Sequence, residues 1–188
     1  MKIHIFGASG SGVTTLGRAL SAICGFPYID SDDFFWAPSE PPFTHKREIT
    51  ERNTLLENEV NSLNNWILGG SIVNWTGLKI KNFDLVVFLY IPLEVRIERL
   101  RKREVERYGE MILRDPIRRK LHEEFIAWAE DYDAATGIAG RTLHAHESWL
   151  QTLDCPIVEI RGDTSVEERI ARILGYLPYA NTESITKK

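Results

Sequence analysis

The stretch GASGSGVTT, residues 7–15, decides the fold. It follows the apolar run IHIF (residues 3–6) and precedes LGRAL (residues 16–20), which is typical of a helix. A strand, a glycine-dense turn and a helix in this order bring backbone N–H groups and the positive end of the helix to one point. The sequence therefore predicts an anion-binding loop, and phosphate is the expected anion.

The spacing of this loop is that of the phosphate-binding motif G-x-x-x-x-G-K-[ST]. Gly7 and Gly12 are its glycines and Thr14 is its hydroxyl, but Val13 occupies the lysine position. An ordinary tight turn before a helix of small residues is the alternative interpretation. The residues expected to contact nucleotide are Gly7, Ser9, Gly10, Ser11, Gly12, Val13, Thr14 and Thr15.

The composition is that of an ordinary globular protein, with 43% hydrophobic and 27% charged residues in a chain of 188. We expect one domain over residues 1–178 and a frayed tail over 179–188. The net charge of −4 gives no support for nucleic-acid binding. No apolar run approaches the ~20 residues needed to span a bilayer, and the N-terminal run lacks the core of a signal peptide.

The two cysteines, Cys24 and Cys155, show neither metal-ligand spacing nor a disulfide framework. We expect them to be buried thiols in a reduced, cytoplasmic protein. His144 and His146 are two positions apart, so they cannot share a helical face and are interpreted as structural.

Five apolar segments separated by helical patterns predict a parallel sheet with helices on both faces. The predicted strands are residues 2–6, 26–29, 66–68, 84–91 and 156–160. Helices are expected from the end of the loop to Cys24, from Thr44, from Leu93 to Arg107, after Pro116 and after Gly140. The helix from Thr44 should have Ile49, Leu56, Val60 and Leu63 on one face. The helix after Pro116 should direct Ile117, Leu121, Phe125 and Trp128 toward the core. Residues 109–116 are expected to be a loop, and a capping box over 164–167 is expected to start the last helix.

Three carboxylates, Asp30, Asp32 and Asp33, follow the second predicted strand. The carboxyl end of a strand beside a phosphate loop is where open α/β sheets bind ligands. We expect Asp33 to cap the next helix and favour function over capping for Asp30 and Asp32. In phosphoryl transfer, such carboxylates lie near Mg²⁺ or near the acceptor hydroxyl.

Residues 33–64 are expected to form a helical insertion that binds the acceptor. Phe34, Phe35 and Trp36 either line an acceptor pocket or belong to the core. Arg47 and Arg52 are candidates for binding an anionic acceptor, although their position on a solvated helix face would also explain them. Gly70 lies at a strand end, where close approach of a substrate or an ordinary turn explains the glycine equally well.

An arginine-rich helix is predicted after Pro92, with Arg99, Arg103 and Arg107 on one face. Interleaved glutamates favour a solvated, ion-paired surface for such a helix. A row of arginines near a phosphate loop can also surround a transferring phosphoryl group. We favour function for Arg103 and the solvated interpretation for Arg96 and Arg101.

The segment GASGSGVTTLGRALSAICGFPYIDSD, residues 7–32, resembles shikimate and gluconate kinases of the P-loop kinase group, which also includes the nucleoside monophosphate kinases. The resemblance implies a three-layer α/β P-loop NTPase fold with a five-stranded parallel sheet and a small helical lid, here about residues 101–120. It also implies that Asp30, with Thr14, helps to hold Mg²⁺ and that Asp32 meets the acceptor hydroxyl.

Residues 92–103 resemble the helix before the lid of adenylate kinases, which implies that Arg99 lies by the adenine and Arg103 by the phosphates. Arg114 loosely matches the return from the lid, and the loop at 161–168, with Thr164, is similar to the loop that contacts the base. The chain departs from the group at Val13 and lacks a D-G-x-P-R element where Gly69-Gly70-Ser71 stands. Adenylate-kinase-like bacterial proteins of unassigned role show a similar loop.

The leading hypothesis is therefore a cytoplasmic kinase that transfers a phosphoryl group from ATP, with Mg²⁺, to a small-molecule or nucleotide acceptor. Its predicted catalytic residues are Asp32, Arg103, Arg107 and Arg114. The alternative is a nucleotide-binding module with little turnover, because Val13 removes a charged phosphate contact. Lys79, Lys81 and the lid arginines are the candidate replacements for that charge. Binding of nucleic acid or membrane is not expected.

Overall fold

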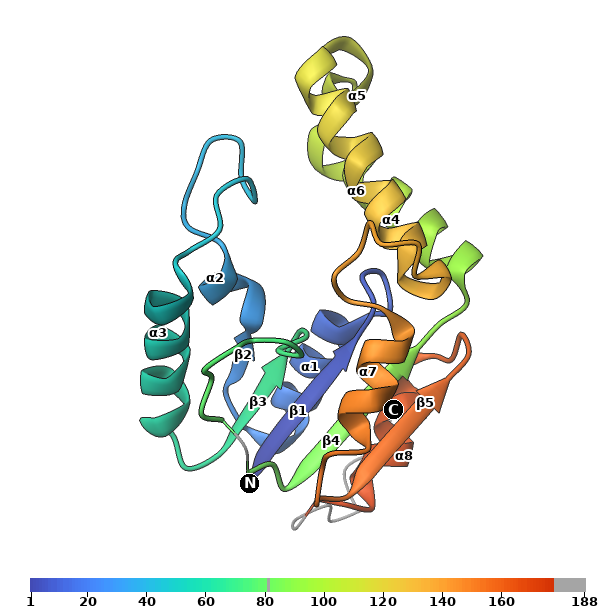
Figure 1. The fold of residues 1–188 in the computed structure, drawn as a ribbon. Coiled ribbons are helices and arrows are strands. Elements are labelled where there is room, and N and C mark those ends of the chain that lie inside the picture. Colours follow the sequence, from blue (N-terminus) through green and yellow to red (C-terminus); the bar gives the residue numbers. More distant parts are fainter. Residues whose placement is uncertain (81, 178–188) are drawn as a thin grey trace.

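The middle layer of the computed structural model, which describes residues 1–80 and 82–177, is a five-stranded sheet (Figure 1). Its strands are β1 (Lys2–Gly7), β2 (Tyr28–Asp30), β3 (Trp66–Gly69), β4 (Leu85–Tyr90) and β5 (Ile157–Arg161), all parallel and in the order β2-β3-β1-β4-β5. The predicted parallel sheet is confirmed. The tail expected over residues 179–188 lies outside the described residues.

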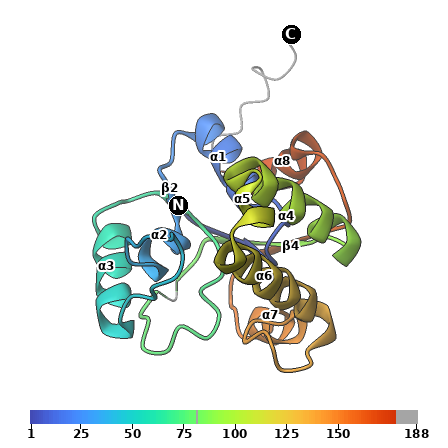
Figure 2. The same cartoon turned by 90° about the horizontal axis from the view of Figure 1, so that it is seen from above.

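Helices cover both faces of this sheet (Figure 2). They are α1 (Val13–Cys24), α2 (Ser31–Phe35), α3 (Ile49–Asn61), α4 (Leu93–Tyr108), α5 (Met111–Arg114), α6 (Pro116–Ala134), α7 (Leu143–Leu150) and α8 (Val166–Leu174). Leu16 of α1 and Ile173 of α8 pack with Ile3 and Ile5 on one face. On the other face, Leu56 of α3 and Leu150 of α7 belong to the cluster that contains Phe6.

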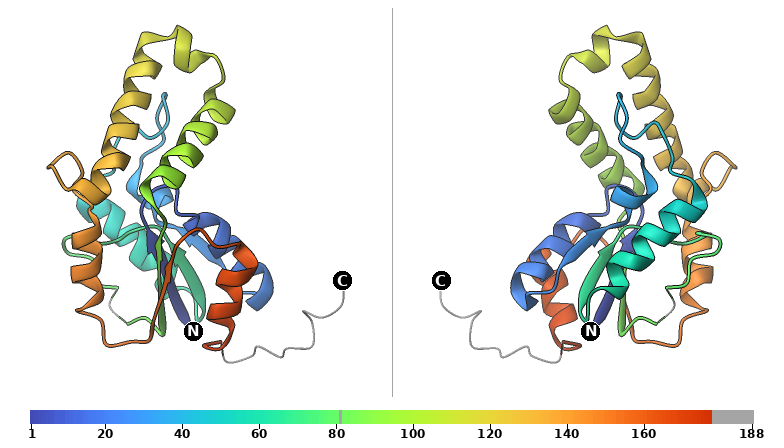
Figure 3. Two further views of the ribbon diagram at one scale, coloured as in Figure 1. Left: turned by 90° about the vertical axis from the view of Figure 1, so that its right-hand side faces the viewer. Right: turned by 90° about the vertical axis from the view of Figure 1, so that its left-hand side faces the viewer.

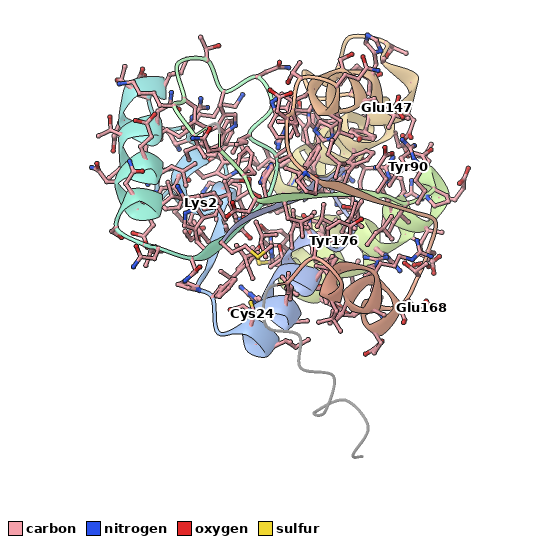
Figure 4. The ribbon with its side chains drawn as sticks, turned by 90° about the horizontal axis from the view of Figure 1, so that it is seen from below. Lys2, Cys24, Tyr90, Glu147, Glu168 and Tyr176 are labelled. Carbon is pink, nitrogen blue, oxygen red and sulfur yellow. The ribbon has the colours of Figure 1, made fainter. Side chains whose placement is uncertain are left out.

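This alternation follows from the strand geometry. Successive side chains of a strand point to opposite faces, so Ile3 and Ile5 face α1 and α8 while Phe6 faces α7. The inner strands β1, β3 and β4 are buried on both faces because helices cover both, whereas the edge strand β5 exposes Glu159 and Arg161. The sheet therefore holds the carboxyl ends of β1, β2 and β3, with the loops that follow them, along one edge. Lys2 and Cys24 lie on the opposite side, which Figure 4 views from below.

The helices α4 and α6 rise from the sheet as a pair that α5 joins at the far end (Figure 3). Ile97 and Leu100 of α4 pack against Ile126 and Ala129 of α6 at the base of this projection. Arg96 is fully buried there and pairs with Asp133, so the solvated position expected for Arg96 is wrong.

Three predictions about helices are wrong in detail. The helix expected from Thr44 begins at Ile49, because Lys46 instead forms an antiparallel bridge with Trp36. The segment expected to be a loop over 109–116 contains the short helix α5. Ile117, expected in the core, is 67% exposed because it lies at the far end of the projection, where no layer covers it.

Two further expectations are corrected at the helix ends and the cysteines. Ser165, not Thr164, caps α8, and its partner in the capping box is Glu168. Cys24 and Cys155 are half-buried rather than buried.

Within residues 1–80 and 82–177, we find no helix whose length and apolar character would let it cross a membrane.

Candidate nucleotide and acceptor site

The glycine loop between β1 and α1 is built from backbone groups. Gly10 and Gly12 adopt φ values of 82° and 90°, which side-chain-bearing residues rarely adopt. The Ser11 N–H donates to Ala8 O at 3.1 Å and closes the turn. Gly12 is the N-cap of α1, and no side chain among residues 1–80 and 82–177 caps this helix. The N–H groups of the first turn are therefore left for an external anion.

Arg169 of α8 supports this loop from beneath. Its side chain is buried, and Nη1 donates to Ser11 O at 2.9 Å. A Cβ at position 12 would lie 2.9 Å from the same nitrogen, so a larger residue there would displace the Arg169 guanidinium and would also be strained by the positive φ. Thr164, predicted to contact the base, accepts a hydrogen bond from Arg169 Nε at 3.1 Å. Arg169 was not predicted from the sequence, because nothing local to residue 169 indicates a contact with a loop 158 residues away.

Asp30 joins the loop to the end of β2. The Thr14 hydroxyl donates to Asp30 Oδ2 at 3.2 Å, and the Tyr28 hydroxyl donates to the same oxygen at 3.1 Å. Asp30 Oδ1 accepts the Asp32 N–H and caps α2, so the prediction that Asp33 caps this helix is wrong. A hydroxyl and a carboxylate side by side are hard oxygen donors of the kind that Mg²⁺ prefers, so these residues fit the ion.

Asp32 faces two guanidinium groups. The crowding of protein atoms around its carboxyl, together with the Asp30 carboxylate, raises the pKa of Asp32, while Arg141 and then Arg103 oppose the rise. Among the described residues, Asp32 forms an ion pair with neither arginine, so the predicted residue Arg103 acts on it only at longer range, across the space between α2 and α4. Arg141 follows α6 and was not predicted, because its loop has no recognisable motif.

Arg103 and Arg107 lie on the side of α4 that faces the acceptor segment. The crowding of protein atoms around its guanidinium, followed by the neighbouring Arg107, lowers the pKa of Arg103, although 46% of its side chain is exposed. The Arg107 guanidinium lies 5.3 Å from the ring centre of Phe43, in the loop between α2 and α3. Of the row predicted on this helix, Arg107 therefore contacts the acceptor segment, whereas the Arg103 guanidinium lies 5.8 Å from the ring centre of Phe125 in α6.

The other two predicted arginines point elsewhere in this structure. Arg114 is paired with Glu110 at 2.5 Å near the tip of the projection, with 79% of its side chain exposed. Arg99 pairs with Asp163, in the loop after β5, at 2.6 Å. Arg99 thus lies beside the β5–α8 loop, which the resemblance predicts to contact the base. Arg114, in contrast, lies away from Asp32.

The two acceptor-side arginines differ in what they contact. Arg47 donates from Nε to Phe34 O at 3.1 Å and from Nη2 to Trp36 O at 3.2 Å, so it holds the chain after α2 in place. Arg52 is 7% exposed and its guanidinium carbon lies 4.0 Å from the ring centre of Trp75. Among the described residues, Arg52 has no carboxylate partner, and burial lowers the pKa of its guanidinium.

Gly70 follows β3 directly beside the carboxylates. A Cβ on Gly70 would lie 2.0 Å from Ser31 Oγ and 3.7 Å from Asp30 Oδ1. The next residue, Ser71, bonds to His146 Nε2 at 2.9 Å, and the Tyr132 hydroxyl bonds to His146 Nδ1 at 2.9 Å. His146 is thus buried in a hydrogen-bonded chain that ties α7 and α6 to the end of β3, which agrees with its predicted structural role.

A small pocket opens where the first half of the glycine loop meets α6 and the segment after it. Its lining includes Gly7, Ala8, Ser9, Trp128, Ala129, Tyr132, Arg141 and His146. The pocket therefore lies between the glycine loop and the segment after α6 that carries Arg141.

A parallel sheet with an uncapped glycine loop after its central strand and a hydroxyl and carboxylate beside that loop defines a P-loop domain with the fold of small-molecule kinases. Residues 3–126 match the family described as "AAA domain", and the chain belongs to this family of P-loop proteins. The P-loop kinase group identified from residues 7–32 is confirmed.

Three similar proteins illustrate the relationship. The uncharacterized protein YqaC of Bacillus subtilis is 44% identical over 94% of this chain and 97% of its own length. A shikimate kinase of Thermosynechococcus vestitus is 30% identical over 65% of this chain and 70% of its own. The solved structure of a deoxyadenosine kinase from M. mycoides with bound dATP covers 95% of this chain and 100% of its own at a TM-score of 0.58 and 15% identity, which shows a shared fold.

Proposed function

We propose that the protein is a cytoplasmic phosphotransferase that moves the γ-phosphoryl group of a nucleoside triphosphate to a hydroxyl of a small acceptor. One observation carries this proposal: Thr14 and Asp30 are hydrogen-bonded beside the uncapped start of α1, and Asp32 follows at the same edge. In this assignment Thr14 and Asp30 hold Mg²⁺, which supplies charge neutralisation of the phosphates when bound. Asp32 accepts the proton of the attacking hydroxyl.

The elevated pKa of Asp32 suits this assignment. A carboxylate with a raised pKa is a stronger base than one with an ordinary pKa, and Arg141 and Arg103 limit the rise in the pKa of Asp32. The two arginines also provide positive charge where the transferred group would be, which stabilises the charge that develops in phosphoryl transfer. Arg107 extends this charge toward the acceptor segment.

The acceptor that we propose carries an anionic group. A buried guanidinium is costly unless it is paired, and Arg52 is stacked on Trp75 with no carboxylate partner among the described residues. A carboxylate or phosphate on the acceptor would pair with it in a bidentate geometry. The shikimate kinase among the relatives supports a small-molecule acceptor, and a nucleotide that accepts the group on a ribose hydroxyl fits the same proposal.

The second candidate is a nucleotide-binding module with little turnover. Val13 favours it, because the motif lysine normally reaches the β- and γ-phosphates. Titration calorimetry with ATP and ADP, with and without Mg²⁺, tests the part that both candidates share. A protein that binds neither nucleotide refutes both.

An ADP-release assay separates the two candidates. We would offer ATP with a panel of matched acceptors: hydroxy acids, sugar acids and nucleoside monophosphates against neutral sugars and nucleosides. Turnover confined to the acidic acceptors is the expected result. Nucleotide binding without turnover on any acceptor favours the module, and turnover on neutral acceptors alone refutes the role of Arg52.

A further inference from the structure

The site described above lacks one positive charge on its loop. Val13 is a half-buried apolar residue that packs against the cluster between the sheet, α1 and α8. Position 13 therefore contributes packing and no charge. In the P-loop motif, the lysine at this position reaches the β- and γ-phosphates, so a triphosphate in this loop needs a cation from another segment.

We propose that Arg141 supplies this cation and binds the γ-phosphate of the nucleotide. Arg141 lines the same pocket as Gly7, Ala8 and Ser9, the first half of the loop. Among residues 1–80 and 82–177, its guanidinium has neither a hydrogen bond nor an ion pair, so its five donors are available to a ligand. This inference rests on the proposed nucleotide site and gives Arg141 a specific role in it, as the replacement for the motif lysine.

The segment that carries Arg141 is firmly anchored. The buried carboxylate of Asp131 accepts the Thr136 N–H at 2.6 Å through Oδ1 and the Ala139 N–H at 2.7 Å through Oδ2. These hydrogen bonds lower the pKa of Asp131 to about 2, so the carboxylate is ionised at any ordinary pH. The end of α6 is thereby folded into a fixed turn that leads directly to Arg141.

The other side of Arg141 is fixed as well. Thr142 is the N-cap of α7 and its hydroxyl accepts the Ala145 N–H at 3.1 Å. The guanidinium carbon of Arg141 lies 5.3 Å from the ring centre of Trp128, which orients the planar group. An arginine held on both sides loses little conformational freedom when it binds an anion.

The position of Arg141 also matches the direction of transfer. It lines the pocket beside the first half of the loop, and Asp32 follows β2 at the same edge of the sheet. A phosphoryl group that passes from the loop to a hydroxyl at Asp32 would travel between these groups. A planar fork of donors suits the oxygens of such a group.

The other cations considered for this role either form hydrogen bonds within the protein or lie away from the pocket. Arg169 is engaged beneath the loop by Ser11 O and Thr164 Oγ1. Lys79 is exposed, and its backbone N–H bonds to Glu57 of α3. Lys81, the other lysine considered from the sequence, lies outside the described residues. Arg103 of α4 acts on Asp32 but does not line the pocket beside the glycine loop.

Calorimetric titrations of a non-hydrolysable ATP analogue and of ADP, both with Mg²⁺, test the proposal on the full chain. Arg141→Met should weaken the analogue about 10- to 100-fold and ADP by less than about 3-fold, because only the analogue has the γ-phosphate. Arg101→Met, which changes an exposed arginine of α4, is the matched control and should leave both affinities unchanged.

Each other outcome of this experiment has a definite meaning. Equal weakening of both ligands by Arg141→Met would assign the residue a structural role and overturn the inference. Unchanged affinity for both ligands also overturns it but leaves the proposed function intact. A wild-type chain that binds neither ligand refutes the proposed function, and the inference with it.

A rescue experiment removes any dependence on one variant. Adding Val13→Lys to Arg141→Met should restore most of the lost affinity for the analogue, whereas Val13→Lys in the wild-type chain should have a smaller effect. Strictly additive effects would contradict replacement of one charge by the other. Arg141→Lys keeps the charge and covers the case in which the methionine variant does not fold: it should weaken the analogue more than ADP, and an equal loss for both would refute the proposal.

Discussion

Acidification from pH 7 to pH 5 is expected to destabilise the protein by about 2 kcal/mol through His4 alone. His4 lies fully buried in β1, and burial lowers its pKa from 6.5 to about 4, against the opposing effect of a hydrogen bond to Leu68 O. The unfolded chain takes up a proton near pH 6.5, whereas the folded chain resists until about pH 4. Stability is therefore full above pH 6.5 and falls as the pH drops toward 4.

The magnitude follows from the gap between the two pKa values. Once the unfolded state is protonated and the folded state is not, each pH unit removes about 1.4 kcal/mol from the free energy of unfolding. His146 should add a similar amount, because burial, followed by the nearby charge of Arg141, lowers its pKa to about 3. A combined loss of about 4 kcal/mol is a large part of the stability of a typical domain.

Urea unfolding of wild type and His4→Phe at pH 7 and pH 5 measures the effect. The ring of His4 stacks with Phe6 and Phe83, each at 5.2 Å between ring centres, so a phenyl ring fits the site and loses only the 3.1 Å hydrogen bond to Leu68 O. The variant should lose about 2 kcal/mol less than wild type between the two pH values. His45→Gln, a change at an exposed histidine, should retain the wild-type difference. An identical difference in His4→Phe and wild type would refute the reasoning.

Three further predictions concern the site. Asp32→Asn should reduce turnover at least about 100-fold while ATP affinity, measured by calorimetry, changes little, because the amide removes the base and keeps the shape. Arg169→Met should weaken ATP and ADP by equal factors of about 10, since it removes the hydrogen bond that supports Ser11 O beneath both nucleotides. Arg52→Gln should raise the KM for an acidic acceptor about 10-fold or more in steady-state assays and leave the KM for ATP unchanged, because the lost ion pair belongs to the acceptor.

The sheet and the loop could be predicted from the sequence because their signals are local. The run before Gly7 is apolar, the loop has its own spacing, and Asp30 follows the next strand at a short distance. Parallel strands then bring these ends together at one edge without further information. The hydrogen bond between Thr14 and Asp30 is the geometry that this reasoning anticipates.

The errors arose where tertiary contacts override a local pattern. Arg96 lies in a helix whose alternating charges indicate a solvated surface, yet it is buried against Asp133 of α6, 37 residues away. Ile117 continues an apolar helical face, but that face extends beyond the body of the protein and has no layer to pack against. Periodicity tells which residues share a face and does not tell what covers it.

Arg141 and Arg169 were missed for a related reason. Neither belongs to a motif, and each reaches the loop only through the packing of a later element: α8 for Arg169 and the anchored turn after α6 for Arg141. A phosphate needs positive charge at a position in space, and any segment that passes that position can provide it. Sequence spacing therefore locates the backbone cradle more reliably than it locates the charges around it.

The positive charge that Arg141 brings to the glycine loop depends on a segment outside that loop. A lysine at position 13 would be part of α1 and would be present whenever the loop is folded. Arg141 instead depends on Asp131 of α6, and α6 is held to α4 by the ion pair between Asp133 and the buried Arg96. If Arg141 binds the γ-phosphate, the binding of a triphosphate is coupled to the position of the α4–α6 projection, whereas the binding of a diphosphate is not. Replacement of the lysine by a distant arginine would thus make the discrimination between ATP and ADP depend on the same helices that face the acceptor through Arg103 and Arg107.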